Sequence, residues 1–144
     1  ILAGSSGLYE SAMGNSYPRR GDRDYIAERI RDVFYVKEVA TEELIDEVFA
    51  TVNDRNKAIK TLAISKSAIR HNMSNDIKEF EVPTCIVWGR QDDVTPPEVA
   101  DKFKDLMPNS ELHWIDECGH AAMMERPEEF NTIIQKWLDK LLPY

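Results

Sequence analysis

Residues 82–97 read Val-Pro-Thr-Cys-Ile-Val-Trp-Gly-Arg-Gln-Asp-Asp-Val-Thr-Pro-Pro, and this stretch predicts the fold class. Residues 84–88 form a continuous β-favouring run that ends at Gly89, which is typical of a parallel strand covered on both faces. Residues 95–98, Thr-Pro-Pro-Glu, have the pattern of a capping box with proline at the first helical position. A strand followed directly by a helix indicates an α/β protein.

The chain continues into a second strand, expected at residues 112–115, and a last helix after Pro127. That helix carries apolar residues at helical spacing: Phe130, Ile133, Ile134, Trp137, Leu138 and Leu141. The order strand, helix, strand, helix predicts a right-handed crossover and a parallel sheet. Two or three strands leave an open sheet edge, so we expect that half of the domain lies outside this sequence.

The first half of the sequence has a different pattern. Residues 1–3, Ile-Leu-Ala, indicate the end of a buried strand that opens into an irregular, Gly- and Ser-rich connection. From residue 24 to about residue 72, apolar residues recur at three- and four-residue spacing, which predicts three helices. Thr41 is a suitable N-cap for the second helix, and Asn53 or Asp54 for the third.

The composition is that of a soluble globular domain, with 42% hydrophobic and 31% charged residues among 144. A net charge of −8 disfavours binding to nucleic acid or to anionic membranes. No apolar stretch approaches the roughly 20 residues of a membrane span. Cys85 and Cys118 suggest no disulfide framework and no secretory leader opens the chain, so we expect a cytoplasmic protein.

Two polar residues follow the two predicted strands at their carboxyl ends. Asp92 comes just after the strand that ends at Gly89, and His120 comes just after the next strand. Functional groups of open α/β sheets gather at this edge, and neighbouring parallel strands lie about 5 Å apart. A carboxylate beside an imidazole fixes the histidine tautomer and stabilises the imidazolium that forms when the ring takes a proton.

These segments resemble the α/β-hydrolase family. Residues 82–97 look like its acid-bearing segment, and residues 118–131, Cys-Gly-His-Ala-Ala-Met-Met-Glu-Arg-Pro-Glu-Glu-Phe-Asn, look like its histidine segment, in the same order and separation. By this resemblance Asp92 is the triad acid and His120 the general base. Asp93 competes for the role of the acid, but the family places that residue third after the glycine, which favours Asp92.

The resemblance implies a partial α/β-hydrolase fold in three parts. Residues 1–7 would be a strand of the sheet, residues 8–80 a helical cap, and residues 81–144 the carboxyl-terminal part of the core. A complete member of the family carries its nucleophile on a Gly-x-Ser-x-Gly elbow earlier in the chain. No segment of this sequence matches that elbow, so the nucleophile is missing. Residues 4–7, Gly-Ser-Ser-Gly, have the wrong spacing, and residues 14–18, Gly-Asn-Ser-Tyr-Pro, end in proline. We therefore expect this segment to be inactive alone.

Other candidate residues are assigned with less support from the motifs. Val94, Ala121 and Met123 are candidates for binding the substrate, and for Met123 and Met124 the alternative is that they fill the core. Cys118, two residues before the histidine, is interpreted as a packing residue. The remaining histidines are given structural roles, since neither pairs with a cysteine or histidine at metal-ligand spacing: His71 and His113.

The resemblance implies a serine-type hydrolase of a small-molecule ester or similar acyl bond, with no metal or organic cofactor. A carbon–carbon bond hydrolase stays open, and an aspartate nucleophile would instead give an epoxide hydrolase or a dehalogenase. An alternative from another class is a non-catalytic interaction module that pairs through its open sheet edge. The expected partner of the chain is the missing amino-terminal half of the hydrolase, and a homo-oligomer is also left open.

Overall fold

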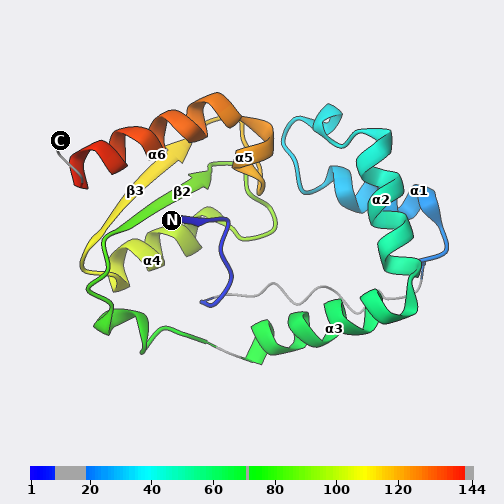
Figure 1. Ribbon diagram of the computed structural model, residues 1–144, viewed down its shortest axis with the longest axis horizontal. Helices are drawn as coiled ribbons and strands as arrows, with labels where there is room; N and C mark the ends of the chain where they lie inside the picture. Colours follow the sequence, from blue (N-terminus) through cyan, green and yellow to red (C-terminus); the bar gives the residue numbers. More distant parts are fainter. Residues whose placement is uncertain (9–18, 71, 142–144) are drawn as a thin grey trace.

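The computed structural model describes residues 1–8, 19–70 and 72–141. Within these ranges a three-stranded sheet joins segments that are far apart in the sequence: β1 (Leu2–Ala3), β2 (Thr84–Gly89) and β3 (Ser110–Ile115). All the strands are parallel and β2 lies in the centre (Figure 1). The predicted parallel sheet is therefore confirmed. The last strand begins two residues earlier than expected, because Ser110 already pairs with Thr84.

β2 is buried along its whole length because helices cover both of its faces. Side chains alternate along a strand, so Ile86 and Trp88 face one side while Cys85 and Val87 face the other. The first side packs against α4 (Pro97–Leu106) and the second against α6 (Pro127–Leu141). Figure 1 shows these two helices on opposite sides of the sheet. This double cover explains why the sequence of β2 is continuously apolar rather than alternating.

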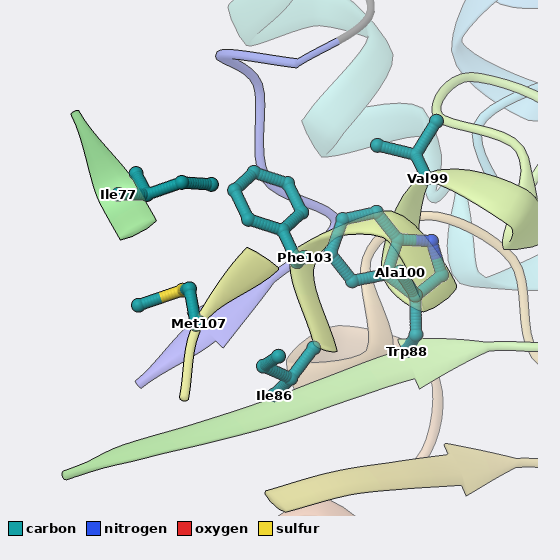
Figure 2. Close-up of a cluster of buried hydrophobic side chains, with 7 residues drawn as sticks. All are labelled: Ile77, Ile86, Trp88, Val99, Ala100, Phe103 and Met107. Carbon is teal, nitrogen blue, oxygen red and sulfur yellow. The ribbon is translucent and has the colours of Figure 1, made fainter. Parts of the chain in front are cut away.

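The larger cluster on the α4 side is centred on two aromatic side chains, Trp88 and Phe103 (Figure 2). Their ring centroids are 6.0 Å apart with the planes inclined at 42°. Ile77, in the short 3₁₀ helix η2 (Ile77–Glu79), packs against the same cluster. The other members are Ile86, Val99, Ala100 and Met107. Because Ile77 joins this cluster, the segment that leads into β2 is fixed to the core of the sheet.

The start of α4 differs from the prediction. Pro96 is the N-cap and Pro97 the first helical residue, so the expected proline at the first helical position is confirmed. The predicted capping role of Thr95 is wrong, since no side-chain hydrogen bond caps this helix. The Thr95 hydroxyl donates instead to the carboxylate of Asp92. The hydroxyl lies against Asp92 and His120, so its oxygen is not placed to accept an N–H of the first helical turn.

Residues 19–70 form a helical layer with its own buried cluster. It contains α1 (Arg23–Arg31), the 3₁₀ helix η1 (Lys37–Val39), α2 (Glu42–Asn53) and α3 (Arg55–Arg70). Its core side chains are Ala27, Ile30, Phe34, Ala40 and Ile45. The three predicted helices are confirmed. In Figure 1 this layer stands beyond the carboxyl ends of β2 and β3, whose arrowheads point towards it. The predicted division at residues 7 and 80 stays a prediction.

Side-chain caps begin each of the three long helices in this layer. Asp22, Thr41 and Asp54 each accept a hydrogen bond from a backbone N–H two or three residues further on. Such caps are worth about 1 kcal/mol each. Of the two candidates for the third helix, Asp54 is the cap, because the Asn53 side chain instead donates to the carbonyl of Phe49. None of the helices in the described ranges is long and apolar enough to cross a membrane.

Candidate active site

Asp92 and His120 meet at the carboxyl ends of β2 and β3. Asp92 follows Gly89, and His120 follows Ile115, the residue that pairs with Gly89 in the sheet. Oδ2 of Asp92 lies 3.0 Å from Nδ1 of His120. The Asp92 side chain is fully buried, whereas 27% of the His120 side chain is exposed. The predicted contact is present, and it leaves Nε2 as the ring nitrogen that is available for proton transfer.

The carboxylate of Asp92 is surrounded by hydrogen-bond donors. Oδ1 accepts the backbone N–H groups of Val94 and Thr95, both at 2.9 Å. Oδ2 accepts the hydroxyl of Thr95 at 2.9 Å in addition to its contact with His120. A buried carboxylate without such donors would be strongly destabilised. The tight turn after β2 therefore supplies the donors that keep this buried acid in place.

Asp93, the competing acid, is exposed and does not lie against the imidazole. The difference between the two acids is that the turn after β2 provides the N–H groups of Val94 and Thr95 as donors to the buried Asp92 carboxylate. The structure thus pairs His120 with Asp92 as the sequence predicted.

The loops that carry the acid and the histidine are bonded directly to each other. The N–H of Gln91 donates to the carbonyl of Cys118, and the N–H of Cys118 donates to Oε1 of Gln91. Gly89 allows this approach, since a Cβ atom there would overlap the carbonyls of Cys118 and Gly119. The distance between Asp92 and His120 is thus set by backbone contacts as well as by the two side chains.

The loop after β1 also reaches the imidazole. Gly4 has a φ of +50°, and a Cβ atom built on it would lie 2.8 Å from Nδ1 of His120. A glycine meets both demands, because it adopts this left-handed conformation without strain and leaves room for the ring. The first strand therefore contributes a wall of the site although it supplies no reactive group.

The three predicted substrate-binding residues are close to this pair in the sequence, since Val94 follows Asp92 and both Ala121 and Met123 follow His120. Val94 is half-buried in the turn that holds Asp92. Ala121 is half-buried directly before α5 (Ala122–Glu125) and packs against the helical cluster. Met123 lies on α5 with 43% of its surface exposed, and Met124 is similarly exposed at 48%. Contact of these residues with a substrate stays a prediction.

Cys118 is a packing residue, as the sequence indicated. It is fully buried in the cluster between the sheet and α6. Burial, with a smaller contribution from the charge of Glu125, raises the pKa of its thiol to about 12. A thiol that stays protonated at neutral pH is neither a nucleophile nor a metal ligand.

The two other histidines were given structural roles. His113 lies on β3, with its Nε2 atom 3.7 Å from Oε2 of Glu111, and His71 lies outside the described residues. The described residues contain no group of three potential metal ligands.

The sequence analysis did not predict that two residues belong to this site. These residues are Thr95, which was interpreted as a helix cap, and Glu125. Glu125 ends the short helix α5, which the sequence did not predict, and its carboxylate accepts the N–H of Gly119. The available signal was an acid directly after four apolar residues, 121–124, in the histidine segment. An acid that directly follows an apolar run is a candidate for a buried side chain, and a buried acid needs hydrogen-bond partners.

Comparison with known proteins shows the family of the chain. Residues 14–127 match the family model described as the alpha/beta hydrolase fold. A 2-hydroxy-6-oxononadienedioate/2-hydroxy-6-oxononatrienedioate hydrolase from Pseudomonas sp is 30% identical over 113 residues, covering 76% of this chain and 40% of that enzyme. A monoacylglycerol lipase from Bos taurus is 31% identical over 77 residues, covering 54% of this chain and 23% of the lipase.

A solved structure gives the same relationship over nearly the whole chain. It is a serine hydrolase involved in carbazole degradation, similar with a TM-score of 0.75 and 26% identity, over 96% of this chain and 52% of the other. The chain thus spans about half of that enzyme and less than half of the curated relatives it matches. The relatives are hydrolases, and the family model covers most of the sequence. The chain belongs to the α/β-hydrolase family.

Proposed function

We propose that this chain supplies the acid and the base of a serine-hydrolase triad, Asp92 and His120, and that the serine belongs to a part of the protein outside these residues. The complete protein would hydrolyse a carboxylic ester or a similar acyl bond. The observation that carries the proposal is the 3.0 Å contact between buried Oδ2 of Asp92 and Nδ1 of partly exposed His120.

The proposed reaction uses each nitrogen of the imidazole for a different task. Nδ1–H donates to the carboxylate of Asp92, which fixes the tautomer in which Nε2 carries the lone pair. Nε2 takes the proton of the serine hydroxyl as the oxygen attacks the carbonyl carbon, and then gives that proton to the leaving group. The buried charge of Asp92 stabilises the imidazolium between these two steps.

Two relatives support a serine nucleophile and an acyl substrate. One is a serine hydrolase, and another is a monoacylglycerol lipase. We further propose that the amino-terminal half of the hydrolase core, which would carry the serine, is the main partner of this chain. A cytoplasmic location belongs to the same proposal, since Cys85 and Cys118 are free thiols, as in a reducing compartment.

A second candidate is hydrolysis of a carbon–carbon bond, and the relative from Pseudomonas favours it. The name of its substrate, a 2-hydroxy-6-oxo dienedioate, contains no ester, so water must cut a carbon–carbon bond next to the 6-oxo carbonyl. The same acid and base would serve this reaction, because a carbonyl is again the centre that is attacked. The two candidates differ in substrate and share the site.

The test is turnover by the full-length protein of a p-nitrophenyl ester series and of a 2-hydroxy-6-oxo-hexa-2,4-dienoate. We expect turnover of one class and a loss of at least about a thousandfold in kcat in His120→Ala. His113→Gln is the matched control, since it alters a histidine on β3 near Glu111 and should leave kcat within about twofold. Turnover of either class that is unaltered in His120→Ala would contradict the proposal.

A further inference from the structure

Glu125 has an unusual place for a carboxylate. It lies at the end of α5, and only 8% of its surface is exposed. Both of its oxygens accept hydrogen bonds from the backbone: from Gly119 at 2.9 and 3.2 Å, from Tyr35 at 2.9 and 3.1 Å, and from Val36 at 3.1 Å. A buried charge is costly unless such donors compensate it, so this carboxylate and its three N–H groups depend on one another.

The three donors come from two separate parts of the fold. Gly119 precedes His120 in the loop after β3, whereas Tyr35 and Val36 lie in the helical layer, about 90 residues away in the sequence. A second bond joins the same two segments, because the N–H of His120 donates to the carbonyl of Val33 at 2.9 Å. The carboxylate therefore lies at the junction between the helical layer and the loop that carries the base.

Backbone space at this junction is fully used. A Cβ atom on Gly119 would lie 2.7 Å from the carbonyl oxygen of Val33 and 2.8 Å from the nitrogen of Tyr35. Main chain thus packs directly on main chain, and Glu125 bonds to both sides of the contact. Movement of either segment would break hydrogen bonds to a buried charge, which is a strong restraint on the position of His120.

We propose that Glu125 is a positioning residue that acts through His120. Its carboxylate locks the segment 33–36 of the helical layer to Gly119, and this contact sets the distance between the imidazole and Asp92. The inference rests on the proposed function, because it assigns Glu125 a role in placing the base of that reaction. Glu125 also links the helical layer to His120, so a displacement of the layer would displace the imidazole as well.

The test uses Glu125→Gln in the full-length hydrolase, with Glu128→Gln as the matched control. Glutamine keeps the shape of the side chain, but its NH2 group would face backbone N–H groups that need an acceptor. Glu128 is exposed, so Glu128→Gln makes the same change of charge without affecting buried hydrogen bonds. We expect Glu125→Gln to lower kcat by about tenfold to a hundredfold with KM within about threefold. Amide hydrogen exchange should accelerate at Tyr35, Val36 and Gly119 together.

A double-mutant comparison separates positioning from a general loss of structure. If Glu125 acts through His120, adding Glu125→Gln to His120→Ala should change the residual rate by less than about twofold. An equal loss of kcat in the wild-type and His120→Ala backgrounds would overturn the inference. So would unchanged exchange at Tyr35 and Gly119. An unaltered rate in His120→Ala would instead contradict the proposed function, so the two failures are distinguishable.

A second variant keeps the test decisive if Glu125→Gln does not fold. Glu125→Asp keeps the charge but shortens the side chain by one methylene, so the carboxylate can no longer reach the N–H groups of Tyr35 and Gly119 together. We expect a smaller loss, about threefold to tenfold in kcat, that again disappears in the His120→Ala background. A Glu125→Asp enzyme with unchanged kcat would count against the proposed role of Glu125.

Discussion

The hydroxyl oxygen of Thr95 lies 3.2 Å from Nδ1 of His120 while it donates to Oδ2 of Asp92 at 2.9 Å. Nδ1 of the imidazole thus faces two oxygens, one from a carboxylate and one from a hydroxyl. The backbone of Thr95 is fixed as well, because its N–H donates to Asp92 and its carbonyl accepts the indole N–H of Trp88. Thr95 therefore connects the buried aromatic cluster to Asp92 and His120.

Thr95→Val should weaken catalysis without unfolding the protein. Valine has the same shape, but it removes the hydroxyl donor from the carboxylate of Asp92. Hydrogen bonds to charged groups are worth about 1.5–3 kcal/mol, so we expect kcat/KM to fall by about tenfold to a hundredfold. Steady-state kinetics of the full-length hydrolase would measure this. Thr95→Ser keeps the hydroxyl and should stay within about threefold; an unchanged kcat/KM in Thr95→Val would show that the hydroxyl has no role in catalysis.

Asp92→Asn and Asp93→Asn form a matched pair that isolates the acid. The first replaces the buried partner of His120 by an amide that favours the wrong imidazole tautomer, and we expect kcat to fall by about a thousandfold or more. The second makes the same change at an exposed neighbour and should leave kcat within about twofold. The kcat of the two purified variants decides the assignment, and a larger loss in Asp93→Asn would reverse it.

Gly4→Ala should damage both stability and activity. The new Cβ atom would meet the imidazole of His120, and a φ of +50° costs a residue with a side chain about 1–2 kcal/mol. We expect a lower Tm and a loss of at least about tenfold in kcat, since the ring must move away from Asp92. Gly21→Ala is the control, because nothing lies within 4 Å of its Cβ position. An unchanged kcat in Gly4→Ala would mean that the imidazole tolerates the displacement.

The buried thiol of Cys118 should give a specific dependence of stability on pH. Burial raises its pKa from an ordinary value of 9.0 to about 12, so the folded state retains the proton more tightly than the unfolded state. The contribution of this thiol to the free energy of unfolding is therefore fully present below about pH 9 and is lost as the pH rises from there towards 12. We expect urea unfolding at pH 8 and pH 10 to show a smaller fall in the free energy of unfolding for Cys118→Ala than for the wild type.

The difference between the free energies of unfolding of wild type and Cys118→Ala does not contain the titration of the lysines and tyrosines that both proteins share. A pH dependence that is identical in both would show that Cys118 is ionised equally in the folded and unfolded states. Alkylation offers an independent check, since neither Cys118 nor Cys85, which is also fully buried, should react at pH 8 until urea is added.

The sequence determined those features that depend on local pattern. A continuous apolar run predicted β2 because a strand covered on both faces has no solvent side. Helical spacing predicted α6 and the three helices before residue 70, and Thr41 was identified as a cap from its residue type and position. The placement of Asp92 and His120 just after adjacent parallel strands was enough to predict that they meet.

What only the tertiary structure decided depends on contacts between distant segments. Thr95 has the sequence of a helix cap, yet the buried carboxylate of Asp92 takes its hydroxyl. Glu125 is one of several acids near the histidine, and it became a buried acceptor only because the backbone of Tyr35 lies against it, 90 residues away. Local pattern fixes which residues share a strand or a helix face, whereas the partner of a buried polar group is chosen by the packing of the whole chain, because that group must find its hydrogen bonds wherever water is excluded.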